Sequence, residues 1–176
     1  MQLFYIFLDN LTLFMLVRHL SHPLYAPIIA ALAALSGALI SQYIFGAHPC
    51  QLCIWQRYPY SAIIALGALA WFMRRHKPSS LFLIVAGILF LATAAIACYH
   101  VGVEQGWVDA PSGCAVSMNP VASLEELKAQ IMAAPLVSCK EAGASFLGLS
   151  MAAWNALYGL MCAAHCVILY RKISRS

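Results

Sequence analysis

The chain has 176 residues, of which 63% are hydrophobic and only 9% are charged, and its mean hydropathy is +0.82. The few polar side chains could not cover the surface of a soluble domain of this size. The composition therefore excludes a soluble globular protein and predicts one integral membrane domain over 1–176. The net charge is +4, but most of the basic residues lie in a few short clusters, which argues against a nucleic-acid partner.

Long apolar runs follow one another along the chain, separated by short polar stretches. A helix needs ~20 apolar residues to cross the hydrocarbon core. We therefore predict an all-α fold, a four-helix transmembrane bundle with one long outer loop at 101–145 that carries a short interfacial helix. The predicted spans cover about 24–46, 54–72, 81–99 and 146–170. The apolar segment 1–20 is either an interfacial helix on the cytoplasmic surface or a frayed terminus.

A Cys-x-x-Cys pair, Cys50 and Cys53, opens the second predicted span. Pro49 suits the start of a helix, so both sulfurs lie in the first turn, where free N–H groups and the positive end of the dipole stabilise a thiolate. Arg57 shares a face with Cys53 and favours its anion, and an arginine inside a span is costly, which makes it a candidate functional residue. Incidental thiols and an arginine that snorkels to the head groups are the alternative interpretation.

Two histidines lie near the predicted level of this pair. His100 lies at the outer end of the third span, at the depth expected for Cys53. It is either a partner of the dithiol or an ordinary interfacial polar group. His48 precedes the pair in a short turn, where a solvated loop histidine is the favoured interpretation.

The long loop carries two further cysteines, Cys114 and Cys139. They flank a predicted helix that begins with the capping box Ser123 to Glu126 and stops before Pro135. A bridge between them would close about 25 residues and contribute ~3–4 kcal/mol. Two dithiols on one side of the membrane can exchange. A permanent staple and a four-cysteine zinc site are the alternatives, and zinc is disfavoured because the loop cysteines are far apart in sequence.

The distribution of charge predicts the topology. Seven of the ten lysines and arginines form clusters on one side: Arg18; Arg74, Arg75 and Lys77; Arg171, Lys172 and Arg175. The positive-inside rule places both termini in the cytoplasm and the four loop and motif cysteines on the oxidising outer side, where disulfides persist. Cysteines inside spans mostly act as small hydrophobic residues, so we assign no role to Cys98, Cys162 and Cys166.

From the first span to the fourth, the chain resembles the bacterial disulfide bond formation protein B (DsbB) family. The resemblance rests on the combination of Pro49-Cys50-Gln51-Leu52-Cys53 with Arg57, Tyr99-His100, Cys114, Cys139 and Phe146-Leu147-Gly148-Leu149. It implies an enzyme of the bacterial inner membrane, a protein-disulfide:quinone oxidoreductase. Such a thiol oxidase reoxidises a periplasmic DsbA-like protein of thioredoxin fold and passes the electrons to ubiquinone or menaquinone.

The resemblance also implies residue roles. Cys114 and Cys139 would form the loop disulfide that receives the partner, with Cys114 in the mixed disulfide and Cys139 then engaging Cys50. Cys53 would be the thiolate that faces the quinone. Arg57 would hold that thiolate and the quinone oxygen, and His100 would lie near the quinone. No metal is expected.

Three other functions compete with this one. A reductase similar to the vitamin K epoxide reductases would run the electrons the other way, but the early position of the Cys-x-x-Cys pair in the chain disfavours it. A tetraspan structural or carrier protein would use the outer cysteines as inert staples. A haem-binding bundle would need axial histidines, and His165 is predicted on the opposite side from His48 and His100.

Overall fold

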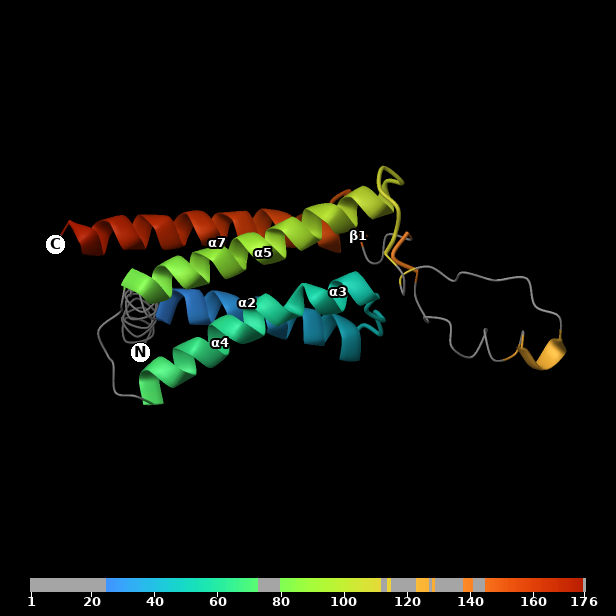
Figure 1. Cartoon of the computed structure of the whole chain (residues 1–176), viewed down its shortest axis with the longest axis horizontal. Helices are drawn as coiled ribbons and strands as arrows, with labels where there is room; N and C mark the ends of the chain where they lie inside the picture. The colour runs from blue at the N-terminus through green and yellow to red at the C-terminus, as the bar shows by residue number, and fades with distance from the viewer. Residues whose placement is uncertain are drawn as a thin grey trace, which may run out of the picture.

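The computed structural model describes residues 25–72, 80–111, 114, 123–126, 128, 138–140 and 145–175. Its elements, in chain order, are α2 (Tyr25–Tyr43), α3 (Gln51–Trp55), α4 (Arg57–Phe72), α5 (Ser80–Glu104), β1 (Ser145–Phe146), β2 (Leu149–Ser150) and α7 (Met151–Ser174). The helices lie along one common direction (Figure 1). The predicted all-α membrane bundle is confirmed. The predicted segment 1–20 lies outside the described residues.

Three of the described helices are long and apolar enough to cross a membrane. These helices are α2, α5 and α7, with mean hydropathies of 1.5, 2.7 and 1.5. Helix α4, with 16 residues, is shorter than a typical span. It is preceded by α3, which continues in nearly the same direction (Figure 1).

The second predicted span is divided in the structure, which corrects the expectation of one helix from Ile54 to Phe72. Helix α3 ends at Trp55 and α4 begins at Arg57. Pro59 explains the break, because it has no N–H to donate to the carbonyl of Trp55 and its ring crowds that carbonyl. At the break, Thr93 Oγ1 of α5 donates to the carbonyl of Gln56 at 3.0 Å.

The ends of the other predicted spans also move. Helix α5 continues to Glu104, so His100 lies within the helix instead of at its end. The last helix begins later than predicted, at Met151, because a hairpin of two-residue strands precedes it. The turn of this hairpin has Leu147 and Gly148 at positive φ, and Ser150 then caps α7 by accepting from the N–H of Ala153 at 3.2 Å.

Close helix packing holds the bundle together. Helix α5 has its most extensive contacts with α7, and the two lie side by side in Figure 1. A Cβ built on Gly159 of α7 would lie 3.0 Å from the carbonyl oxygen of Phe90 on α5, so only glycine allows this approach. The central core lies between α2, α4, α5 and α7 and contains Ala31, Tyr60, Ile63, Ala86, Phe90, Ala163 and Cys166.

A second buried cluster lies at the end of the bundle where α3 begins. It contains Cys50, Leu52, Val103, Cys114 and Cys139. In the loop, Ser123 Oγ accepts from the N–H of Glu126 at 3.3 Å, which agrees with the predicted N-cap. The rest of the predicted loop helix, up to Pro135, lies largely outside the described residues.

Candidate redox site

Cys50 caps helix α3 through its side chain. Its backbone is extended, with φ −74° and ψ 172°, and its sulfur accepts from the N–H of Cys53 at 3.4 Å. The two sulfurs lie 3.1 Å apart as free thiols that share a hydrogen bond. The predicted placement of this pair in a first helical turn is therefore confirmed, with Cys50 as the cap itself.

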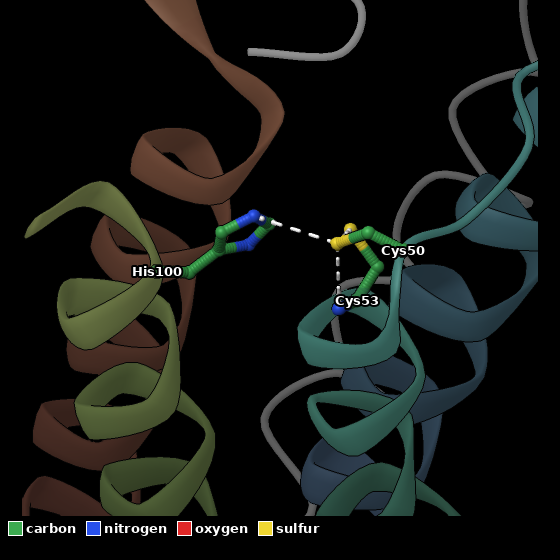
Figure 2. A group of neighbouring side chains, drawn as sticks. All are labelled: Cys50, Cys53 and His100. Atoms are coloured by element: carbon green, nitrogen blue, oxygen red, sulfur yellow. Dashed lines mark hydrogen bonds between the residues drawn. The ribbon is translucent and has the colours of Figure 1, made fainter. Parts of the chain in front are cut away.

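His100 reaches across from α5 to this pair (Figure 2). Its Nε2 lies 3.5 Å from Cys50 Sγ, and the residue is only 3% exposed. Nε2 is also 3.7 Å from Oε1 of Glu104, one helical turn further along α5. Nδ1, on the other side of the ring, lies 3.1 Å from Nε2 of Gln56. Of the two interpretations of His100, the structure supports contact with the dithiol.

The surroundings of the two thiols divide their charge unequally. The hydrogen bond with Cys53 and the contact with His100 outweigh burial and lower the pKa of Cys50 to about 4. The same hydrogen bond, together with burial, raises the pKa of Cys53, although the positive charge of Arg57 acts in the opposite direction. In this dithiol these contacts favour the anion at Cys50, whereas the sequence favours it at Cys53.

The two loop cysteines form a disulfide bond. Cys114 and Cys139 are bonded with their Cα atoms 5.2 Å apart, and both are fully buried. The backbone N–H of Cys139 donates to the carbonyl of Cys114 at 3.2 Å. The disulfide packs in the same cluster as Cys50, so the fold brings the two redox-capable pairs together.

Arg57 begins α4 and is anchored to a neighbouring helix. Its Nη1 donates to Oε1 of Gln42 on α2 at 2.8 Å. Arg57 and Cys53 line the same cavity, so the shared face predicted for them holds. Among the described hydrogen bonds, the guanidinium pairs with the Gln42 amide and not with a sulfur.

The cavity beside Cys53 has a volume of about 560 Å³. Cavities of this size accept small organic molecules. Its walls are mainly apolar and come from α2, α3, α4, α7 and the turn 47–49. The polar and aromatic side chains that line it are Ser41, His48, Cys53, Gln56, Arg57, Tyr60, Trp154, Asn155 and Tyr158.

A buried polar network, which sequence reasoning missed, connects this cavity to His100. Asn155 on α7 donates to Oε1 of Gln56 at 2.6 Å and accepts from the hydroxyl of Tyr60 at 2.6 Å. Its amide also lies 3.4 Å from Thr93 Oγ1 on α5. A signal was present, since Asn155 and Gln56 are amide side chains in otherwise apolar helices, where polar residues usually pair across the interface.

The same atoms bear on metal binding. The donor atoms of Cys50, Cys53 and His100 lie within 4.8 Å of one another, close enough to surround one ion. The loop cysteines are bonded to each other, so this state of the protein differs from a site with four thiolate ligands. We interpret the group as a redox dithiol because a disulfide packs against it.

Among the described residues, Cys98, Cys162, His165 and Cys166 do not line the cavity beside Cys53. Cys98 is exposed on α5. Cys162, His165 and Cys166 line a separate cavity of about 350 Å³ toward the other end of α7. The structure therefore adds no redox role for these residues.

Comparison with known proteins identifies the family. Residues 22–169 match the family model described as disulfide bond formation protein DsbB. An uncharacterised protein of Rickettsia prowazekii is 33% identical, over 76% of this chain and 77% of the relative. The disulfide bond formation proteins B of Saccharophagus degradans and Acinetobacter baumannii are 32% and 26% identical, over 67% and 80% of this chain and 73% and 84% of their own. The chain belongs to the disulfide bond formation protein B family.

Proposed function

We propose that this protein is a quinone-dependent thiol oxidase that reoxidises a periplasmic dithiol protein of thioredoxin fold. Family membership supports a role in bacterial disulfide bond formation. The observation that carries the finer proposal is the packing of the Cys114–Cys139 disulfide against Cys50, with Cys53 on the wall of an apolar cavity. One end of this arrangement can exchange with a protein thiol, and the other can meet a lipid-soluble oxidant.

The exchange begins at the loop disulfide. A thiolate of the partner attacks the sulfur of Cys114, the Cys114–Cys139 bond breaks, and Cys139 leaves as a thiolate. The second thiol of the partner resolves the mixed disulfide and leaves with its own disulfide formed. Cys139 attacks Cys50 of an oxidised Cys50–Cys53 pair, which releases Cys53 as a thiolate. Cys114, released by the partner, then attacks Cys139, which re-forms the loop disulfide and releases Cys50, so the electron pair passes to the Cys50–Cys53 dithiol. Each step moves one electron pair between sulfurs.

The charges support this order. In the free dithiol the contacts favour a thiolate at Cys50, and a charge there raises the pKa of Cys53. Once Cys50 is bonded to another sulfur it no longer carries a negative charge, so it no longer repels a thiolate at Cys53. The positive charge of Arg57 still stabilises that thiolate. The predicted Cys53 anion is therefore proposed for the mixed-disulfide state.

The cavity suits a quinone headgroup. Its walls are mainly apolar, and the Cys53 sulfur and the Arg57 guanidinium lie on it together. Arg57 would donate to a quinone oxygen, and Cys53 would face the ring. When bound, the quinone supplies an acceptor for two electrons and two protons. A strong oxidant is needed because the known potential of DsbA, the dithiol partner in the DsbA–DsbB system, is about −120 mV, so an ordinary stable disulfide could not oxidise such a partner.

We further propose that the protein spans the bacterial inner membrane with its redox cysteines toward the periplasm and both termini in the cytoplasm. Arg171 and Lys172 lie in the last turn of α7. The end of α7 that carries them lies opposite the end of the bundle where α3 begins (Figure 1). The positive-inside rule then supports a cytoplasmic C-terminus.

The proposal is tested by turnover of the purified full-length protein in detergent. A reduced thioredoxin-fold dithiol protein is added with ubiquinone or menaquinone, and partner disulfide and quinol are measured together. We expect equal amounts of the two products and no turnover in Cys53→Ser. Absence of quinol with every quinone, while Cys114–Cys139 stays intact, would exclude the oxidase.

A further inference from the structure

In the network between α7 and His100, the chemistry of the atoms determines which group donates and which accepts in each hydrogen bond. The starting point is the carbonyl of Gln56, which can only accept a hydrogen bond. The hydroxyl of Thr93 lies 3.0 Å from it and must donate its one hydrogen there. Thr93 Oγ1 is therefore an acceptor toward Asn155, whose amide nitrogen lies 3.4 Å away.

This assignment orients the side-chain amide of Asn155. The NH₂ group of Asn155 faces Thr93, and it also donates to Oε1 of Gln56 at 2.6 Å. The side-chain oxygen of Asn155 accepts from the hydroxyl of Tyr60. With Oε1 of Gln56 directed at Asn155, the NH₂ group of the same amide is directed at His100. That group lies 3.1 Å from Nδ1 of His100 and donates to it.

An acceptor Nδ1 carries no hydrogen, so the hydrogen of neutral His100 lies on Nε2. The surroundings of Nε2 agree, because both groups that face it are acceptors when ionised: the sulfur of Cys50 at 3.5 Å and Oε1 of Glu104 at 3.7 Å. The other oxygen of Glu104 is buried and has no hydrogen-bond partner among the described residues.

We propose that Thr93, Asn155 and Gln56 form a polarised relay that holds His100 as the Nε2–H tautomer, with that N–H directed at Cys50. Asn155 is then a positioning residue that acts on the dithiol from the last helix. The N–H stabilises a Cys50 thiolate, whereas the opposite tautomer would present a lone pair to it. The role for Cys50 rests on the proposed function, but the tautomer of His100 does not.

The first test reads the tautomer directly. The full-length protein, with 15N-labelled histidine, is reduced in detergent near neutral pH, and NMR distinguishes pyrrole-type from pyridine-type ring nitrogens. His100→Gln assigns the signal. We expect Nε2 of His100 to be pyrrole-type and Nδ1 pyridine-type in the wild type. A pyrrole-type Nδ1 in the wild type would overturn the proposal.

Two variants test the relay itself. Gln56→Glu keeps the shape but places an acceptor against Nδ1, so a hydrogen should appear on Nδ1. Asn155→Leu keeps the volume but releases the amide of Gln56, so His100 should become a mixture of tautomers. Tyr60→Phe is the matched control, because Asn155 keeps its orientation through Thr93, and the wild-type tautomer should persist. A wild-type tautomer in both Gln56→Glu and Asn155→Leu would overturn the relay.

A second readout follows the consequence for the thiol. Loss of a hydrogen bond to the Cys50 thiolate should raise the pKa of Cys50 in Asn155→Leu, so alkylation of Cys50 below pH 4, where the thiolate fraction limits the rate, should slow by about tenfold or more. An unchanged alkylation rate in a variant whose tautomer has changed would overturn the claim that Asn155 acts on Cys50. Neither measurement uses quinone or partner, so failure of the oxidase assay and failure of the relay are distinguishable.

Discussion

Cys50 lies in the same buried cluster as Cys139, although one residue caps a helix of the bundle and the other belongs to the long loop. Their shared burial places the loop disulfide and the Cys-x-x-Cys pair in one packed cluster. A purely structural disulfide in the loop would not need to pack in one cluster with Cys50. The contact therefore favours exchange over the structural interpretation of the loop cysteines.

The proximity can be trapped chemically. In the double variant Cys53→Ser with Cys114→Ser, Cys50 and Cys139 lose their ordinary partners, and we expect them to bond to each other in nearly every molecule under mild oxidation. Mass spectrometry of non-reduced peptides measures this bond. In a control that carries Cys50→Ser, Cys53→Ser and Cys114→Ser, the exposed Cys98 remains as a possible partner, and we expect no bond to Cys139. Equal bonding in both variants would contradict the specific contact.

The low pKa of Cys50 predicts an unusual pH profile. In the reduced protein Cys50 should react with an alkylating reagent at a nearly constant rate until the pH falls through about 4, where its thiolate is protonated. Because the folded value lies below the ordinary value of 9.0, this ionisation stabilises the fold above pH 9, and the contribution is lost as the pH falls toward 4. Mass spectrometry of Cys50 peptides after timed alkylation gives the profile. A midpoint near 9 would contradict the assignment.

The motif cysteines could be located from sequence because their signals are local. A proline before Cys50 predicts a helix start, and the length of the apolar runs predicts the level of His100 in the membrane. These two local facts place His100 and Cys50 at one level, and the structure adds the contact between them. The break at Gln56 was also readable from Pro59, but the apolar run beyond it masked the signal.

The network around Asn155 could not be located in this way. The spans are apolar on all sides, so periodicity does not reveal which face of α7 meets α5. That rotation is decided by close contacts such as Gly159 against Phe90, which exist only when both helices are in place. Asn155 could be recognised as an unusual residue, but its partners Gln56 and Thr93 come from two other segments of the chain.

The same glycine gives a stability prediction. In Gly159→Ala the new methyl group would lie 3.0 Å from the carbonyl of Phe90 and 3.1 Å from Ala94, so α5 and α7 must separate. Overpacking of this kind costs about 1–3 kcal/mol, and the thermal midpoint in detergent should fall. Gly37→Ala is the matched control, because a Cβ there meets no atom within 4 Å. If both variants melt alike, this packing does not limit stability.

Substitutions at Arg57 and at its partner Gln42 distinguish a functional role of the guanidinium from a structural one. Its guanidinium bonds Gln42 and lines the cavity with Cys53. Removal of a charged donor to a quinone oxygen should lower quinone reduction by about 10- to 100-fold in Arg57→Ala. Arg57→Lys should recover part of this loss, since it restores the charge but not the planar fork. Quinol formation measures the effect. Gln42→Ala is the control: it removes only the anchor, and a loss as large as that of Arg57→Ala would assign the effect to helix packing. Normal turnover in Arg57→Ala would remove Arg57 from the site.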